Sequence, residues 1–243
     1  MLASDQRLPI AGGAEKRAYV RSMFAAIAPT YDRLNRILSL SLDQRWRSYA
    51  VDRLGWERVP DGIYLDLCAG TLDFGAILAR RKEFRGRVVG ADFVRPMLEL
   101  GRRKAGRLEP VTADALVLPF RAASFDGAML GWGLRNLIDL DAGLAEVARV
   151  LRPGGRLVIL DTTTPARGPL RGLSLFYFER VLPRVGRWVS RHRSAYDWLP
   201  ESTRSFPQPP ELAQRLAGAG FGGVGYHLFL GGITALHVGT RAG

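Results

Sequence analysis

The chain has 243 residues, 47% of them hydrophobic and 24% charged, which is enough to bury one large core, with or without a small appendage. Its 35 lysines and arginines outnumber 23 acidic residues, and this net charge of +12 favours nucleic acid or anionic membrane as a partner. The sequence contains no apolar run of about 18 residues, no signal-peptide core and only one cysteine, Cys68, so we expect a cytoplasmic protein without an internal disulfide.

The hydrophobic pattern predicts helices first and then strands that alternate with helices. Residues 14–54 are helical in pattern, with breaks at Pro29 and around residues 39–41. The remaining elements are strands at Ile63–Leu67, Arg87–Asp92, near Val111, at Phe125–Leu130, Arg156–Leu160, near Val224–Leu230 and at Ile233–Thr240; helices at Phe74–Lys82, from about Arg95, at Leu140–Leu151 and Pro210–Ala219; and a turn at Arg152–Gly155. This alternation predicts an α/β fold with a doubly wound, mostly parallel sheet of seven strands. A hairpin at Gly231-Gly232 would supply one antiparallel edge strand.

Two of the predicted strands end in an acid. Residues 63–73 read Ile-Tyr-Leu-Asp-Leu-Cys-Ala-Gly-Thr-Leu-Asp, and 19 residues after Asp73 a second apolar run ends at Asp92. Ligands bind at the carboxyl ends of parallel strands, where an acid can accept two ribose hydroxyls. The tight turn at Gly70 lets the backbone approach a ligand. Because the loop lacks G-x-G-x-x-G and a P-loop lysine, an adenosine ligand without phosphates fits best, and S-adenosylmethionine is the common one. A nucleotide fold with another ligand is the alternative.

Three further residues near this loop have two interpretations each. Thr71 and Asp73 open the first helix, whose N–H groups can bind the carboxylate of methionine. Simple helix capping would select the same residue types. Asp66 we expect to order the loop more than to contact the ligand.

Five separated blocks of residues, in order, carry a resemblance to a known family. They are Phe24–Ser39 with Trp46, Leu65–Asp73, Gly133–Asn136, Arg149–Asp161 with Pro165, and Tyr196–Pro207 followed by Ala219–Phe221 and Ala235–His237. From about Val20 to Arg241 the chain resembles a class I methyltransferase, and more specifically the ubiquinone/menaquinone biosynthesis C-methyltransferase family. It departs from the usual glycine, histidine, methionine, glutamate and serine of that family at Leu72, Asp43, Leu34, Asp161 and Gly131. If position 72 needs a positive φ, a leucine there is strained.

The resemblance implies a Rossmann-like fold and S-adenosylmethionine as cofactor, while the single cysteine and the three scattered histidines predict no metal site. It implies C-methylation of the ring of a demethylated isoprenoid quinol, with demethylmenaquinol as the favoured substrate. Asp114 and Ala115 match the family's adenine-contacting pair, although Asp114 alone reads as an ordinary loop acid. The expected cofactor-binding residues are Asp66, Gly70, Thr71, Asp73, Asp92, Asp114, Ala115 and Gly131.

Three residues are candidates for the chemistry. As the ring carbon attacks the methyl group, Arg135 could stabilise the oxyanion of the quinol and Asn136 could orient its phenolic oxygen. Alternatively, Arg135 pairs internally with Asp139 or Asp32. Tyr31 lies on an N-terminal helix that would have to fold over the cofactor, or else it serves only to pack that helix.

We expect a helical cap at residues 1–54 and a cofactor-binding domain at residues 55–243, with a helical insertion at about 166–208. Residues 166–193 contain seven arginines and one acid, Glu179. An arginine face at residues 180–191, which Pro183 would kink, suggests a membrane-surface element for a polyprenyl-tailed quinol at the inner face of the membrane. The alternative is an insertion packed on the sheet with solvated arginines.

Two other functions are open at this point. A methyltransferase of another phenolic metabolite would share the scaffold. A basic nucleic-acid-binding protein would explain the charge, but no aromatic platform of a known RNA module is present and we expect no nucleic-acid partner. The sequence is compatible with a homodimer.

Overall fold

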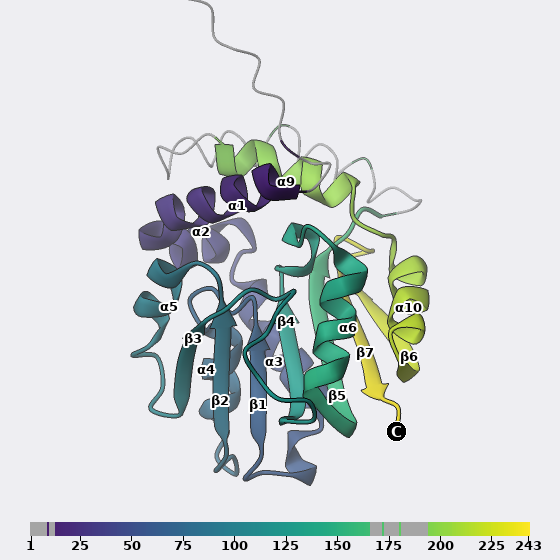
Figure 1. Ribbon diagram of the computed structural model, residues 1–243. Coiled ribbons are helices and arrows are strands. Elements are labelled where there is room, and N and C mark those ends of the chain that lie inside the picture. Colours follow the sequence, from purple (N-terminus) through teal and green to yellow (C-terminus); the bar gives the residue numbers. More distant parts are fainter. Residues whose placement is uncertain (1–8, 10–12, 166–171, 173–179, 181–193) are drawn as a thin grey trace, which may run out of the picture.

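The computed structural model describes residues 9, 13–165, 172, 180 and 194–243 (Figure 1). The arginine face predicted at residues 180–191 therefore lies outside the described residues, apart from Arg180. No helix in the described part of the chain is both long enough and apolar enough to cross a membrane.

A single sheet runs through the middle of the described structure, with seven strands in the order β3-β2-β1-β4-β5-β7-β6. The strands are β1 Ile63–Leu67, β2 Arg87–Asp92, β3 Leu108–Thr112, β4 Phe125–Gly131, β5 Leu151–Thr162, β6 Phe221–Phe229 and β7 Thr234–Arg241. Neighbours from β3 to β5 pair in parallel, whereas β7 is antiparallel to both β5 and β6. The predicted doubly wound, mostly parallel sheet is confirmed.

Two details of the prediction are wrong. The antiparallel strand of the terminal hairpin is not at the edge, because β7 lies between β5 and β6, and β6 forms the edge. Residues 152–155, predicted as a turn before a strand, belong to β5. Leu151 pairs with Phe125 and Arg156 with Gly127, so these four residues bulge opposite the single residue Asp126. The ladder with β4 thus starts earlier than the Pro-Gly-Gly signal suggested.

Helices cover both faces of the sheet (Figure 1). On one face, α6 (Leu140–Val150) and α10 (Pro209–Gly218) bury Leu144 and Leu212 in a core with Leu65 and Ile159. The other face carries α3 (Leu42–Leu54), α4 (Asp73–Ala79) and α5 (Arg95–Gly101). Their apolar side chains form a second core with the strands.

The remaining helices lie across the carboxyl ends of the strands (Figure 1). They are α1 Gly13–Ile27, η1 Ala28–Thr30, α2 Tyr31–Leu38 and α9 Ser194–Arg204, while η2 Trp56–Arg58 and η3 Leu134–Asn136 are single turns. The helix breaks predicted at Pro29 and at residues 39–41 are confirmed, and Leu40 and Ser41 there have positive φ. Helix α3, the last helix of the predicted cap, shares its core with the sheet. The division into a cap and a cofactor-binding domain stays a prediction.

Candidate active site

A pocket of about 760 Å³, part of which is open to solvent, lies at the carboxyl end of the sheet. Its walls come from the loops that follow β1, β2, β3 and β4, and Arg17, Val20 and Phe24 of α1 line it as well. Among the predicted site residues, those that line the pocket are Tyr31, Gly70, Asp92, Asp114, Ala115, Gly131 and Asn136. Asp66, Thr71, Asp73 and Arg135 are not among the lining residues.

Asp92 has the geometry expected of a ribose ligand. Its Oδ2 accepts the N–H of Gly70 at 2.8 Å and its Oδ1 accepts the N–H of Val94 at 2.8 Å. Each oxygen keeps a lone pair for a hydroxyl donor. Burial raises the pKa of the Asp92 carboxyl to about 6, although these N–H groups oppose the shift. A vicinal diol would therefore meet an oriented carboxylate that is largely ionised at neutral pH.

Asp66 lies under the loop that joins β1 to α4. The side chain is buried, and its Oδ2 accepts the N–H of Gly75 at 2.8 Å in the first turn of α4. Burial raises the pKa of Asp66 to about 8. The residue thus fixes the start of the helix, and its place in the cofactor-binding set stays a prediction.

Asp114 is bound by the N-terminal helix. Arg17 of α1 forms an ion pair with Asp114 Oδ2, and Asp114 Oδ1 accepts the N–H of Leu116 at 3.0 Å. One residue earlier in α1, the buried Lys16 donates to the carbonyl oxygen of Leu137 at 2.7 Å, and burial lowers its pKa. Helix α1 is therefore attached at two sides of the pocket that it covers.

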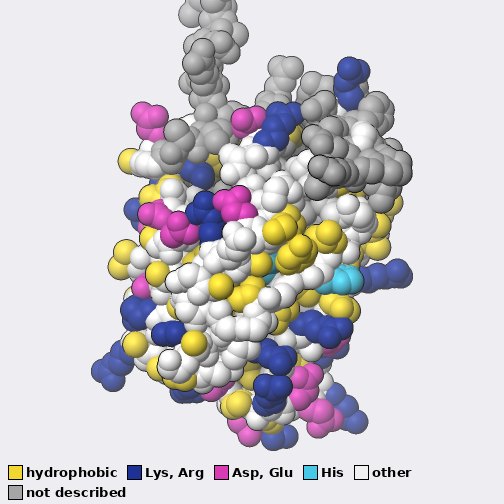
Figure 2. All heavy atoms as spheres, turned by 90° about the vertical axis from the view of Figure 1, so that its right-hand side faces the viewer, with side chains coloured by type: hydrophobic (Ala, Val, Ile, Leu, Met, Phe, Trp, Pro, Cys, Tyr) yellow, Lys and Arg dark blue, Asp and Glu magenta, His cyan; other side chains and the backbone are white. Residues whose placement is uncertain are grey.

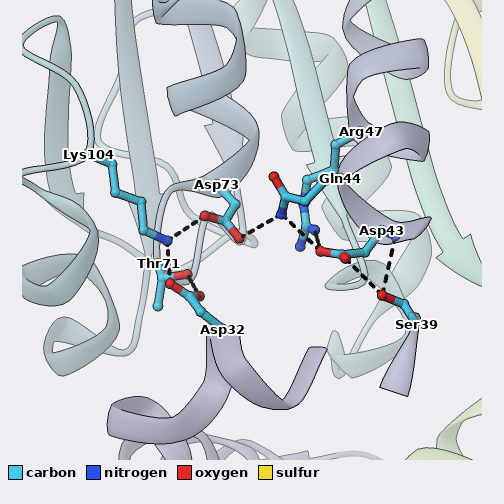
Figure 3. A network of polar contacts seen from close by, with 8 residues as sticks. All are labelled: Asp32, Ser39, Asp43, Gln44, Arg47, Thr71, Asp73 and Lys104. Atoms are coloured by element: carbon cyan, nitrogen blue, oxygen red, sulfur yellow. Dashed lines mark hydrogen bonds and ion pairs between the residues drawn. The ribbon is translucent and has the colours of Figure 1, made fainter. Parts of the chain in front are cut away.

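Thr71 and Asp73 belong to a polar network (Figure 3). Thr71 Oγ1 donates to Asp32 on α2, and Lys104 Nζ lies 2.6 Å from Asp32 Oδ2 and 2.5 Å from Asp73 Oδ1. Although burial opposes it, the charges of Arg47 and Lys104 hold the pKa of Asp73 below its ordinary value. In this structure the two residues tie the loop after β1 to the helices above it.

The network continues into α3 (Figure 3). Gln44 Nε2 donates to Asp73 Oδ2 at 3.4 Å and to Asp43 Oδ2 at 3.0 Å. Asp43 also accepts Arg47 Nη1 at 2.5 Å and Ser39 Oγ at 2.8 Å. Asp43, which stands where the resembled family usually has histidine, is thus a buried and fully partnered acid.

Leu72 has a positive φ, with φ 62° and ψ 26°, which is the case in which we predicted a strained leucine. A non-glycine residue in this region costs about 1–2 kcal/mol. Its side chain is completely buried, and two glycines make room for it. A Cβ on Gly90 would lie 2.0 Å from Leu72 Cδ2, and one on Gly101 would lie 2.9 Å from Leu72 Cβ. Burying a leucine stabilises by about 1.5–3 kcal/mol, which offsets the strain.

Gly131, at the end of β4, is a second departure with a structural reason. A Cβ at this position would lie 2.8 Å from the ring of Phe74. The buried Phe74 ring of α4 therefore occupies the space that a serine side chain would need.

Around Asn136 the pocket is lined with aromatic side chains. Asn136 Oδ1 accepts Trp198 Nε1 of α9 at 2.8 Å, and its Nδ2 donates to the carbonyl oxygen of Trp132 at 3.3 Å. Trp132 has a φ of 54° and also lines the pocket. Tyr31 is hydrogen-bonded to Asn35, and burial raises the pKa of its hydroxyl, which keeps it protonated.

Arg135 is paired internally, but not with either partner that we predicted. Its Nη1 lies 2.6 Å from Asp161 Oδ1 and donates to the Trp132 carbonyl oxygen at 2.8 Å. Asp139 instead caps α6 by accepting the N–H of Ala142, and Asp32 binds Lys104. The Nε of Arg135 is buried and has no hydrogen-bond partner among the residues that the structure describes. Arg135 thus fixes the turn from Trp132 to Asn136.

Two further residues with ionisable side chains are His237, which is part of the packed interior, and Cys68, which is partly buried and lines the pocket. His237 is buried, its Nε2 lies 2.9 Å from the carbonyl oxygen of Pro209, and burial lowers its pKa. Burial also raises the pKa of the Cys68 thiol well above its ordinary value, so the thiol is protonated. The described residues include no cluster of three His, Cys, Asp or Glu side chains that could hold a metal ion.

The sequence reasoning assigned no site role to several residues that the structure brings to this region: Arg17, Gln44, Lys104, Trp132 and Trp198. Arg17, Lys104 and Trp198 are far along the chain from Asp114, Asp73 and Asn136, which are their respective partners. The only sequence signal was that Trp198 belongs to one of the family-like blocks.

The residues present fit S-adenosylmethionine. Asp92 offers a buried carboxylate whose oxygens have lone pairs to spare, and the loop from Gly70 supplies a close backbone approach without a phosphate cradle. The apolar lining near Val94 and Met97 suits an adenine ring.

Comparisons with known proteins agree with this fit. The model of the ubiE/COQ5 methyltransferase family matches residues 13–241. A demethylmenaquinone methyltransferase of Thermus thermophilus is 46% identical over 90% of this chain and 100% of its own length. A ubiquinone/menaquinone biosynthesis C-methyltransferase of a Geobacter species is 40% identical over 93% of this chain and 98% of its own.

Solved structures share the fold. An S-adenosylmethionine-dependent methyltransferase from Aquifex aeolicus superposes with a TM-score of 0.54 at 16% identity, covering 79% of this chain and 92% of that one. At such identity the likeness shows the fold alone. The family model and the curated relatives cover nearly the whole chain, and the protein therefore belongs to the ubiE/COQ5 methyltransferase family and is an S-adenosylmethionine-dependent methyltransferase.

Proposed function

We propose that this protein methylates a ring carbon of a demethylated isoprenoid quinol, demethylmenaquinol being the substrate we favour. The observation that carries this proposal is the identity to relatives named for that reaction over their whole length. Two parts of the proposal rest on the sequence alone. One is that the protein approaches the surface of the membrane that holds such a quinol, and the other is that it forms a homodimer.

The pocket supports this assignment with two chemically different ends. Asp92 and Asp114 follow β2 and β3, whereas Trp132 and Asn136 follow β4, on the other side of β1 in the sheet. The acidic end suits the ribose and adenine of the cofactor. The end with Trp132 suits a flat aromatic acceptor that carries a phenolic oxygen.

Bound S-adenosylmethionine supplies an electrophilic methyl group. Held by Asp92 and the loop at Gly70, it would give this methyl group to a ring carbon of the quinol and leave as the neutral thioether, and the ring would then release a proton. Asn136 has a second Nδ2 proton to donate to the phenolic oxygen, and the protonated Tyr31 can donate as well. These contacts orient the acceptor, and alignment alone can contribute about 7–11 kcal/mol.

Arg135 enters the proposal in a changed role. Because its charge is balanced by Asp161, we propose that it acts on the acceptor through the turn that it holds. Arg135→Met would then lower kcat while leaving the affinity for S-adenosylmethionine unchanged.

Purified protein should be incubated with S-adenosylmethionine and either demethylmenaquinol, a soluble phenol or RNA, with products identified by mass spectrometry. We expect one methyl group on the quinol ring and none on the other two. Methylation of the soluble phenol alone would favour a methyltransferase of another phenolic metabolite. Methylated RNA would favour a nucleic-acid substrate.

A further inference from the structure

Aromatic rings continue outward from the pocket wall in an unbroken row. Trp132 lies 6.5 Å from Trp46, which lies 5.6 Å from Phe229, measured between ring centroids. Phe229 lies 5.6 Å from Tyr49 and 4.8 Å from His227, and these two rings lie 5.5 Å apart. We refer to these five residues as the aromatic strip. Helix α3 and the edge strand β6 supply four of them.

The strip leads from the pocket to the surface of the molecule. Trp132 lines the pocket, whereas His227, at the other end, is exposed. The three rings between them are only partly buried. Figure 2 faces the edge strand and shows hydrophobic side chains gathered there beside a histidine. Two guanidinium groups flank the row, Arg47 at 4.5 Å from the Trp132 centroid and Arg53 at 4.7 Å from that of Tyr49.

Packing of α3 on the sheet does not require this row. The helix already buries Ala50, Val51 and Leu54 completely or almost completely against the strands. Trp46 and Tyr49 lie beside that core and keep exposed ring surface. These partly exposed rings form an apolar surface beside the pocket that a hydrocarbon ligand would cover.

We propose that the aromatic strip binds the prenyl chain of the quinol whose ring lies against Trp132. This inference rests on the proposed function. A quinol ring held at Trp132 must place its flexible hydrocarbon substituent somewhere, and contact of that substituent with water is unfavourable. The strip is an apolar surface continuous with Trp132 that reaches the outside of the molecule.

The test compares two substrates, demethylmenaquinol with its prenyl chain in detergent micelles and the same ring without a chain. Phe229→Ala and Tyr49→Ala remove rings from the middle and the outer part of the strip. Tyr226→Ala is the matched control, because Tyr226 is on the same strand but in register with His237, and its side chain contacts that residue on the opposite face. Thermal unfolding shows whether each variant is folded, and Tyr49→Ala decides alone if Phe229→Ala is not.

We expect each strip variant to raise KM for the chain-bearing quinol about 3- to 10-fold, the range for an aromatic contact. The kcat for both substrates and the KM for the chain-free ring should stay unchanged, as should both substrates with Tyr226→Ala. Equal effects on the two substrates, no effect, or an equal effect of Tyr226→Ala would overturn the assignment. A wild-type protein that methylates only the chain-free ring would overturn it too, whereas one that methylates neither would refute the proposed function itself.

Discussion

Asp92 joins two loops of the pocket, since one oxygen holds Gly70 after β1 and the other holds Val94 after β2. Asp92→Asn keeps the shape but removes the charge that two ribose hydroxyls would use. We expect calorimetry to show S-adenosylmethionine binding weakened by about 1.5–3 kcal/mol. Asp126→Asn is the control, because Asp126 also accepts a backbone N–H, from Ile63, but does not line the pocket. Unchanged affinity in folded Asp92→Asn would remove Asp92 from the site.

The raised pKa of Asp92, about 6, predicts how cofactor affinity depends on pH. Hydroxyl donors bind the ionised carboxylate, so the cofactor favours the deprotonated form. Affinity should be constant above about pH 7 and should fall by up to tenfold per pH unit below about pH 6. Binding titrations from pH 5 to 8 measure this, and Asp92→Asn should lose the dependence. A wild-type affinity that is flat down to pH 5 would contradict the assignment.

Leu72 and Gly90 form a pair that should be coupled in stability. Gly90→Ala would bring a Cβ into the space of the Leu72 side chain, so we expect a loss of about 1–3 kcal/mol in the free energy of unfolding. In a Leu72→Ala background the same change should cost much less, because the side chain that it meets is gone. Urea unfolding of the two single variants and the double variant gives the coupling energy, expected at about 0.5–3 kcal/mol. Additive effects would show that Gly90 and the Leu72 side chain do not meet as the structure indicates.

At the scale of elements, α1 covers the pocket, where Arg17 binds Asp114 and Lys16 binds the Leu137 carbonyl oxygen. A ligand beneath it adds contacts on its inner side. We therefore predict that S-adenosylmethionine slows amide hydrogen exchange in α1 more than in α3, whose residues Ala50 and Val51 are already in the sheet core. Equal slowing in both helices would indicate a general gain in stability and not a closure of α1.

The elements that the sequence predicted well are those whose pattern is local. Buried apolar runs such as those ending at Leu67 and Asp92 give strands with the predicted bounds. Pro29 interrupts the α-helical pattern through its own ring and not through distant contacts. The predicted bounds are wrong where pairing with a neighbouring strand determines the start of an element. Strand β6 begins at Phe221, across a run of glycines, because β7 supplies its hydrogen bonds.

The same distinction applies to the site. Asp92 could be predicted because a strand end is defined locally. The partner of Arg135 could not, because the sequence suggested Asp139 or Asp32 and only the parallel pairing of β4 with β5 brings Asp161 close. Lys104 was not predicted as a site residue because its ion-pair partners, Asp32 and Asp73, are distant in the chain.

At the scale of the whole molecule, the net charge of +12 and the seven arginines of residues 166–193 predict attraction to anionic bilayers. Each cation near the surface contributes about 1 kcal/mol, and the attraction is screened over about 8–10 Å. The protein should sediment with anionic vesicles at low salt and less at high salt, and replacing Arg184 and Arg187 by glutamate should abolish this. The double variant should still methylate a chain-free quinol. Equal binding to neutral vesicles would leave the segment as ordinary solvated surface.

The interior position of β7 has a consequence for how the chain is made. Strand β6 leaves the ribosome before β7, yet it can reach the sheet only through β7, which pairs with β5. Until β7 has emerged, the edge of β5 is open and the rings and leucines of β6 have no strand beside them. During synthesis these two unpaired edges are therefore open to pairing with another chain.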